Sequence, residues 1–141
     1  MAGHDPRLRS GRHGGVLTAA DALAALRSAV GRDEEDWIFA LALEIRDRLR
    51  DSLRGRNGTV DGWDAPPVDP QDNWTVLVAA LVGHEFDVAG LSPPGWTVGL
   101  RSTDAWVLDT PRLTEAEIRA QTPAWLAERN IFVAAKDLIT L

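Results

Sequence analysis

Residues 33–55 read DEEDWIFALALEIRDRLRDSLRG, and this stretch carries the strongest structural signal in the chain. Apolar residues recur in it every three or four positions, which places them on one face of an α-helix; they are Ile38, Leu41, Ile45, Leu49 and Leu53. Acidic residues at its start and arginines at its end suit the helix dipole. We predict a helix with its N-cap at Asp33 and its end at Gly55, with Trp37 at the edge of the buried face.

A second helix is expected before this one, from about Ala19 to Val30. Thr18 is its predicted N-cap, because a threonine hydroxyl accepts a hydrogen bond from a free N–H of the first turn. Gly31 ends the helix, since glycine readily takes the backbone conformation that follows a helix. Only Gly31 and Arg32 stand before the next N-cap, so the two helices are predicted to form a hairpin.

A third long helix is expected from about Pro70 to Ala89. Asp69 is its predicted N-cap and Pro70 its first residue, because proline is well tolerated at the first helical position. Gly90 is expected to end it. The predicted buried side consists of Trp74, Leu77, Val78, Leu81 and Val88.

Two short helices are predicted nearer the C-terminus. Thr114 and Glu117 form a capping box, in which each side chain bonds the backbone N–H of the other residue. That helix runs to about Ala120. The next begins at Thr122 and ends near Asn130, because asparagine tolerates the left-handed conformation that closes a helix.

The chain is therefore predicted to be mainly α, with a helical hairpin, a third long helix and a C-terminal segment of short helices and irregular chain. Residues 97–113 are ambiguous, since Trp106-Val107-Leu108 fits either a short strand or a helical turn. A minor β element is expected near Trp106 or Ile131. Residues 16–141 are expected to form a single helical domain, a size that one core can serve.

The composition excludes several classes of protein. The 141 residues include no cysteine, which rules out disulfides, thiolate zinc sites, iron–sulfur clusters and cysteine nucleophiles. No apolar run approaches the roughly 20 residues of a membrane span, and no apolar leader opens the chain. We therefore expect a cytoplasmic protein that makes no membrane contact.

Charge is unevenly distributed along the chain. The formal net charge is −6, and residues 1–15 hold three arginines against one aspartate, so they carry +2 and the remainder carries −8. A disordered basic tail on an acidic body is predicted. The tail is either a solvated leader or an arm that folds back on the body or contacts nucleic acid. The acidic body itself disfavours nucleic acid as a partner.

A long connector is expected at residues 55–69, which are rich in glycine, proline and aspartate. Within it, Trp63 either pins the loop to the body or contacts a partner. Trp96 also stands beside a proline-rich turn. The tryptophans that fall on predicted helices, and are core candidates, are Trp37, Trp74 and Trp125.

No residue pattern predicts catalysis, a metal site or a cofactor. His84-Glu85 begins a zinc-protease motif, but the second histidine would stand at position 88, which is valine. No Gly-x-Ser-x-Gly elbow or phosphate-binding glycine loop occurs. His84 is either a packed histidine bonded to a carboxylate such as Asp87, or part of a small-molecule pocket with Asp87 and Trp96.

Four short motifs follow one another in the second half of the chain: Trp63-Asp64-Ala65-Pro66-Pro67, residues 89–97 (AGLSPPGWT), Thr122-Pro123-Ala124-Trp125 and residues 129–133 (RNIFV). In this order they resemble a poorly characterised helical domain of actinobacteria. That domain follows an Xre-type DNA-binding domain in some regulators and stands alone in other chains. Some relatives resemble the antitoxin side of a pair with a nucleotidyltransferase-like toxin. The resemblance covers about residues 60–141 and carries over no catalytic residue.

The chain is predicted to be a non-enzymatic regulatory or protein-interaction protein. The role that the resemblance suggests is that of the antitoxin-like partner of a toxin such as a nucleotidyltransferase. Aromatic side chains anchor interfaces and carboxylates steer a basic partner. Two alternatives stay open: a small-molecule-binding protein or enzyme with a pocket at His84 and Asp87, and a weak DNA binder through the basic tail. The predicted partner-binding residues are Trp63, Asp64, Trp96, Asp104 and Trp106.

Overall fold

The computed structural model of the chain describes residues 18–55, 62–64 and 72–139. The predicted tail and most of the predicted connector lie outside the described residues, as do Asp69 and Pro70. The described chain is mainly helical, which confirms the predicted fold class.

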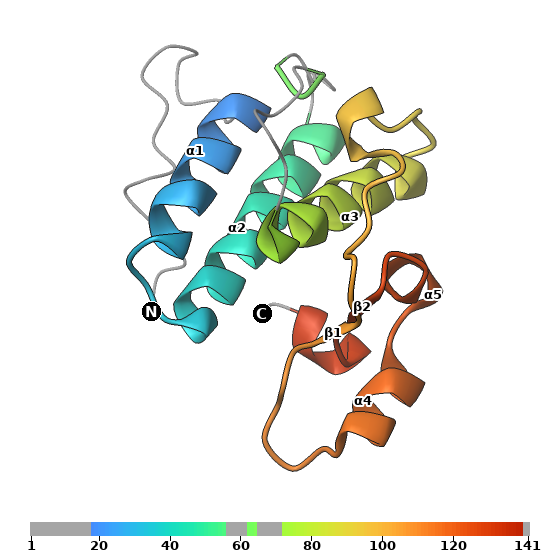
Figure 1. Ribbon diagram of the computed structural model, residues 1–141. Coiled ribbons are helices and arrows are strands. Elements are labelled where there is room, and N and C mark those ends of the chain that lie inside the picture. Colours follow the sequence, from blue (N-terminus) through green and yellow to red (C-terminus); the bar gives the residue numbers. More distant parts are fainter. Residues whose placement is uncertain (1–17, 56–61, 65–71, 140–141) are drawn as a thin grey trace.

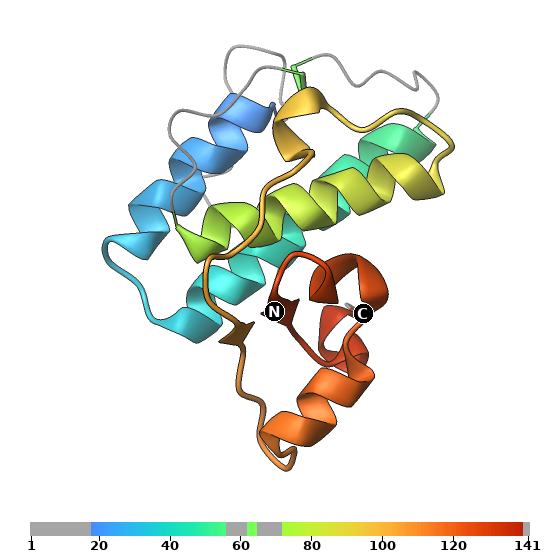
Figure 2. The same ribbon diagram turned by 45° about the vertical axis from the view of Figure 1, so that its right-hand side comes forward.

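Three long helices make up the larger part of the fold. They are α1 (Ala19–Val30), α2 (Glu35–Arg54) and α3 (Asn73–Val88). α1 and α2 form the predicted hairpin, and α3 packs against α2 and also contacts α1 (Figures 1 and 2). The short elements between residues 106 and 138 gather on one side of these helices in both views.

The start of α1 is capped as predicted, and its first residue is also hydrogen-bonded to residues 62–64. The Asp21 N–H donates to Thr18 Oγ1 at 3.2 Å, and the Ala19 N–H donates to the carbonyl of Gly62 at 2.9 Å. Gly62 has a φ of 91°, and a Cβ there would lie 2.6 Å from the Thr18 methyl carbon. Glycine is therefore required where residues 62–64 meet the helix.

The start of α2 differs from the prediction in two ways. The N-cap is Glu34 and not Asp33, and its side chain makes no capping hydrogen bond. Trp37, predicted at the edge of the buried face, is 66% exposed. It lies in the first turn of α2, about 100° around the helix from Ile38, and so outside the contact with α1 and α3. The predicted stripe itself is buried at Ile38, Leu41, Ile45 and Leu49.

α3 begins three residues later than predicted. Its N-cap is Asp72, whose carboxylate accepts a hydrogen bond from the Thr75 N–H at 2.8 Å. The first helical residue is Asn73, so the assignment of Pro70 to this position is wrong. Either aspartate before the helix matches the sequence preference for an N-cap, and the pattern alone does not choose between them.

The end of α3 confirms the prediction at Gly90. This residue has a φ of 78°, the Leu91 N–H donates to the Phe86 carbonyl at 2.9 Å, and the Gly90 N–H donates to the Asp87 carbonyl at 3.0 Å. These two bonds make a Schellman motif. Val88, predicted on the buried side, is 66% exposed because it lies in the last turn, beyond the core.

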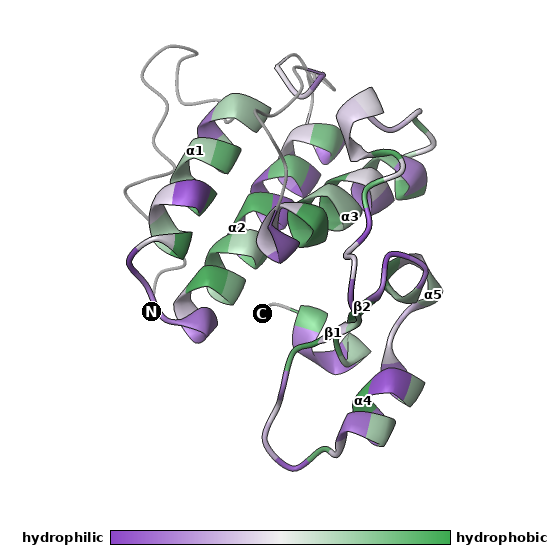
Figure 3. Cartoon of the chain, viewed as in Figure 1, coloured by the Kyte–Doolittle hydropathy of each residue, from purple (hydrophilic) through white to green (hydrophobic). Residues whose placement is uncertain are grey.

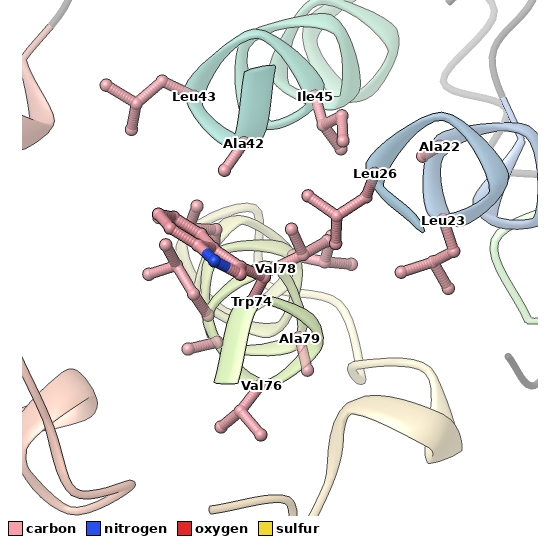
Figure 4. Close-up of a cluster of buried hydrophobic side chains, with 14 of the residues drawn as sticks. Ala22, Leu23, Leu26, Ala42, Leu43, Ile45, Trp74, Val76, Val78 and Ala79 are labelled. Carbon is pink, nitrogen blue, oxygen red and sulfur yellow. The ribbon is translucent and has the colours of Figure 1, made fainter. Parts of the chain in front are cut away.

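The main core lies where α1 and α2 face α3. Figure 4 shows Leu26 of α1 and Ala42 and Ile45 of α2 pointing toward Trp74 and Val78 of α3, and all five are buried. The middle of α3 is apolar around its circumference (Figure 3), and residues 74–83 are all buried. Such a helix must be covered on several sides, which explains why the C-terminal segment packs against it.

The C-terminal segment contains a small parallel sheet. β1 (Trp106–Val107) pairs with β2 (Ile131–Phe132), with Trp106 opposite Ile131. The Trp106 N–H donates to the Asn130 carbonyl at 2.9 Å, and the Leu108 N–H donates to the Phe132 carbonyl at 3.0 Å. The ambiguous residues around Trp106 are therefore a strand.

Two short helices, α4 (Glu115–Gln121) and α5 (Ala124–Ala127), connect the strands. The predicted capping box is present: the Glu117 N–H donates to Thr114 Oγ1 at 3.1 Å, and the Thr114 N–H donates to Glu117 Oε1 at 2.8 Å. Asn130 has a φ of 67°, as expected. The 3₁₀ turns of this half are η2 (Gly95–Thr97) and η3 (Ala135–Leu138).

Candidate functional site

Trp63 and Trp96, two of the predicted partner-binding residues, lie inside the molecule. Trp63 is 1% exposed and Trp96 is 9% exposed. The Trp96 indole N–H donates to the Trp63 carbonyl at 2.7 Å, which joins residues 62–64 to η2. Trp63 therefore holds residues 62–64 against the body, and neither indole is presented to a partner. The neighbouring Asp64 is exposed.

Trp106 is half-buried and also packs inward. Its ring meets the Trp74 ring edge-on, with centroids 4.7 Å apart and an angle of 84° between planes. This geometry is favourable for aromatic pairs and ties β1 to the start of α3. Asp104 is exposed two residues before the strand and lines a cavity of about 200 Å³.

His84 is packed, but its partner is an aromatic ring. Its imidazole stacks on Trp125 with centroids 4.0 Å apart and 7° between planes, and within the described ranges it makes no hydrogen bond to Asp87. Burial lowers the pKa of His84 below its ordinary 6.5, because removal from water disfavours the imidazolium. Asp87 is exposed, and neither residue lines the cavity at Asp104 or the hollow described below.

Glu85, which in the sequence stands out only as part of an incomplete zinc-protease motif, is a buried carboxylate in contact with a cation. It is 5% exposed, and its two oxygens accept hydrogen bonds from Nε and Nη2 of Arg50, both at 2.8 Å. This bidentate pair raises the pKa of Arg50. It joins α2 to α3, and its function is structural.

Two further arginines also hold the fold together. Arg46 is buried on α2, where its guanidinium donates to the Leu138 carbonyl and pairs with Asp47 at 2.9 Å. Arg129 donates to the carbonyls of Thr97 and Leu100, at 2.7 and 3.1 Å. Arg46 falls four residues after Ala42 and three before Leu49, so helical spacing alone would have placed it on the buried face.

The tip of the helical hairpin carries an exposed aromatic side chain in an acidic setting. Trp37 lies in a hollow of about 490 Å³ at the turn between α1 and α2. One cation and three carboxylates surround it, so the local charge is negative. The other lining residues are Arg32, Asp33, Glu34 and Asp36. We call this surface the hairpin tip.

Comparisons with protein families, with curated proteins and with solved structures find no match for this chain. Within the described ranges, no group of three or more histidine or acidic side chains is arranged to hold a metal ion. No helix in that part of the chain is long and apolar enough to cross a membrane.

Proposed function

We propose that this chain is a non-enzymatic interaction protein that binds a basic surface of a partner protein through the hairpin tip. The observation that carries the proposal is the exposure of Trp37 among the carboxylates of Asp33, Glu34 and Asp36. This surface replaces the one predicted around Trp63 and Trp96, whose indoles are buried.

An exposed tryptophan favours a protein partner for a physical reason. Its ring presents a large apolar area with one hydrogen-bond donor, and tryptophan is enriched among the residues that dominate binding energy. Trp37 is 66% exposed, the same fraction as Val88, but its side chain is much larger than that of valine and it lines a hollow. A partner side chain that enters the hollow would remove from water both its own apolar surface and that of the Trp37 ring.

The carboxylates determine which partner surface fits. Negative groups around an apolar centre attract lysines and arginines, which speeds association and disfavours acidic competitors. A basic toxin that acts on nucleic acid has such a surface. Together with the resemblance to antitoxin-like chains, this complementarity supports the toxin encoded by the neighbouring gene as the partner.

The polar groups that catalysis would use favour a non-enzymatic role. His84 is stacked on Trp125, and both oxygens of Glu85 are bound by Arg50. These contacts engage both side chains in packing and pairing, which supports a binding role. The proposed activity is therefore binding.

Copurification of the full chain with the product of the adjacent gene tests the proposal. Trp37→Ala should weaken the complex at least tenfold, while Val88→Ala, an equally exposed apolar truncation elsewhere, should leave its affinity unchanged. Both variants should keep the wild-type melting temperature, because each side chain is mostly in solvent. An unchanged affinity for Trp37→Ala, or no complex with the wild-type chain, would overturn the proposal.

A further inference from the structure

We propose that the basic tail, residues 1–15, binds the hairpin tip of its own chain and competes there with the partner protein. Because this contact uses the hairpin tip as a binding surface, it rests on the proposed function. The contact can nevertheless be measured on the chain alone, so its presence does not depend on the partner being found.

The hairpin tip centres on an apolar ring and not on charge alone. Trp37 is 66% exposed and lines a hollow of about 490 Å³. Glu34 and Asp36 line the same hollow and are exposed. The whole lining holds three carboxylates and one arginine, which gives a formal charge of −2. A fitting occupant is therefore an apolar group flanked by cations, which removes the ring from water and neutralises the charge.

The basic tail contains such a group. Residues 7–9 read Arg-Leu-Arg, which is one apolar side chain between two cations, and the tail carries a formal charge of +2. Leu8 can cover the Trp37 ring while the flanking arginines approach the carboxylates. A guanidinium also stacks favourably on the face of an indole. The tail thus matches the hairpin tip in charge and in hydrophobicity.

The length of the tail suits the distance that it must span. The described chain begins at Thr18, and α1 runs from there to the hairpin tip, a length of about 18 Å for 12 residues. Arg9 and Arg7 stand nine and eleven residues before Thr18. A flexible chain of that length spans about 15–20 Å on average. The effective concentration of a tethered group is highest when its tether matches the distance, so these arginines are well placed to reach the tip.

A tail bound at the hairpin tip would cover the surface that the partner needs. The apparent affinity for the partner falls in proportion to the fraction of hairpin tips that are free. Partner binding would then include release of the tail. Loss of the tail's cations should therefore strengthen the complex.

A spin label in the tail of the full chain tests the contact without any partner. The chain contains no cysteine, so Ser10→Cys provides a single labelling site. We expect the label to reduce the indole N–H signal of Trp37 by at least half, relative to the same chain with the label reduced. The signals of Trp63 and Trp96 should fall less, because these residues lie by the start of α1, where the tail is attached. A loss at Trp63 and Trp96 as large as that at Trp37 would overturn the proposal, since the tail would then stay near its attachment.

Two pairs of substitutions test whether charge holds the tail in place. Combining Arg7→Gln with Arg9→Gln should reduce the signal loss at Trp37 at least twofold. Combining Arg101→Gln with Arg112→Gln makes the same change in net charge at exposed arginines outside the hairpin tip, and should leave the loss as in wild type. NaCl at about 0.5 M should act like the first pair, because it shortens the screening length well below the roughly 10 Å of 0.1 M salt. A loss at Trp37 that neither the first pair nor salt reduces would refute the contact.

A mixing experiment tests whether the tail binds its own chain. Isotope-labelled chain without the spin label, mixed with spin-labelled chain of natural isotope abundance, should show no loss at Trp37. A loss as large as that within one chain would mean that the tail binds a second copy, and would contradict the proposal.

Binding of the adjacent gene's product tests the competition. The pair Arg7→Gln and Arg9→Gln should bind this product more tightly than wild type does, and equal affinity would refute competition by the tail. If the spin label places the tail at the hairpin tip but the wild-type chain and this pair both form no complex, the proposed partner is wrong and the tail contact stands.

Discussion

Individual polar residues in this protein have partners that are distant in sequence. His84 stacks on Trp125, and Glu85 is held by Arg50, which lies 35 positions away. The sequence pattern predicted packing as one of two interpretations of His84, with Asp87 as the partner. Local spacing carries no information on such contacts, because the partners come from separate helices. Trp37 differs from its prediction for the same reason. Helical spacing placed it at the edge of the buried face, but no neighbouring element covers it, and it is exposed.

The lowered pKa of His84 predicts a pH dependence of stability. The unfolded chain takes up a proton near pH 6.5, whereas the folded chain does so only at lower pH. The contribution of His84 to the free energy of unfolding should therefore be fully present above pH 6.5 and should decrease as the pH drops toward 5.5. Urea unfolding at pH 7.5 and pH 5.5 measures the change, and His84→Gln should show a smaller one.

The other two histidines, His4 and His13, are present in wild type and in His84→Gln alike. Their contributions to the pH dependence of stability therefore cancel between these two proteins. An identical loss of stability between the two pH values in wild type and His84→Gln would contradict the assignment to His84. A loss confined to pH values below 5 would indicate carboxylates instead.

Helix ends follow local rules, and most of them are readable from the sequence. The caps at Thr18 and Thr114 form as predicted, and the predicted helix end at Gly90 takes the form of a Schellman motif. The two wrong assignments, at the starts of α2 and α3, fall in runs that contain more than one acidic residue. Before α3, Asp69 and Asp72 both satisfy the N-cap preference, and the helix begins after the second; at α2 the N-cap is Glu34, whose side chain makes no capping bond.

Asp72 provides the clearest test of a cap. Asp72→Ala should lower the free energy of unfolding by about 1 kcal/mol, because the Thr75 N–H loses its acceptor. Glu34→Ala is the matched control, since Glu34 is an N-cap whose side chain makes no capping bond. Chemical denaturation measures both, and a loss for Glu34→Ala as large as that for Asp72→Ala would contradict the argument.

Two arginines hold the C-terminal segment in place, one against α2 and one against η2 and the chain that follows it. Arg46 reaches from α2 to the Leu138 carbonyl, and Arg129 reaches back to the chain that follows η2. Together with the pairing of β1 and β2, these bonds close the segment over α3.

Arg129→Ala should weaken the attachment of the C-terminal segment to η2 and to the chain that follows it. Its guanidinium donates to two carbonyls, and hydrogen bonds to charged groups contribute about 1.5–3 kcal/mol, so we expect the free energy of unfolding to fall by about 2 kcal/mol. Hydrogen exchange should quicken at Ser102 and Trp106, whose N–H groups bond the neighbouring carbonyls of Arg129 and Asn130.

Arg54→Ala removes an exposed arginine at the end of α2 and serves as the control, with an expected change within about 0.5 kcal/mol. Equal stability of Arg129→Ala and Arg54→Ala would show that Arg129 does not fasten the segment. Exchange that quickens evenly over the whole chain would instead indicate a global effect.

The sequence by itself determined the three long helices, the hairpin and most caps, because helical periodicity and capping depend on residues within a few positions of one another. Only the tertiary structure decided that Trp63 and Trp96 are buried, that Trp37 is exposed and that the hydroxyl of Ser102 is buried. Exposure depends on which distant segments cover a residue, and no local pattern in a single chain encodes that cover.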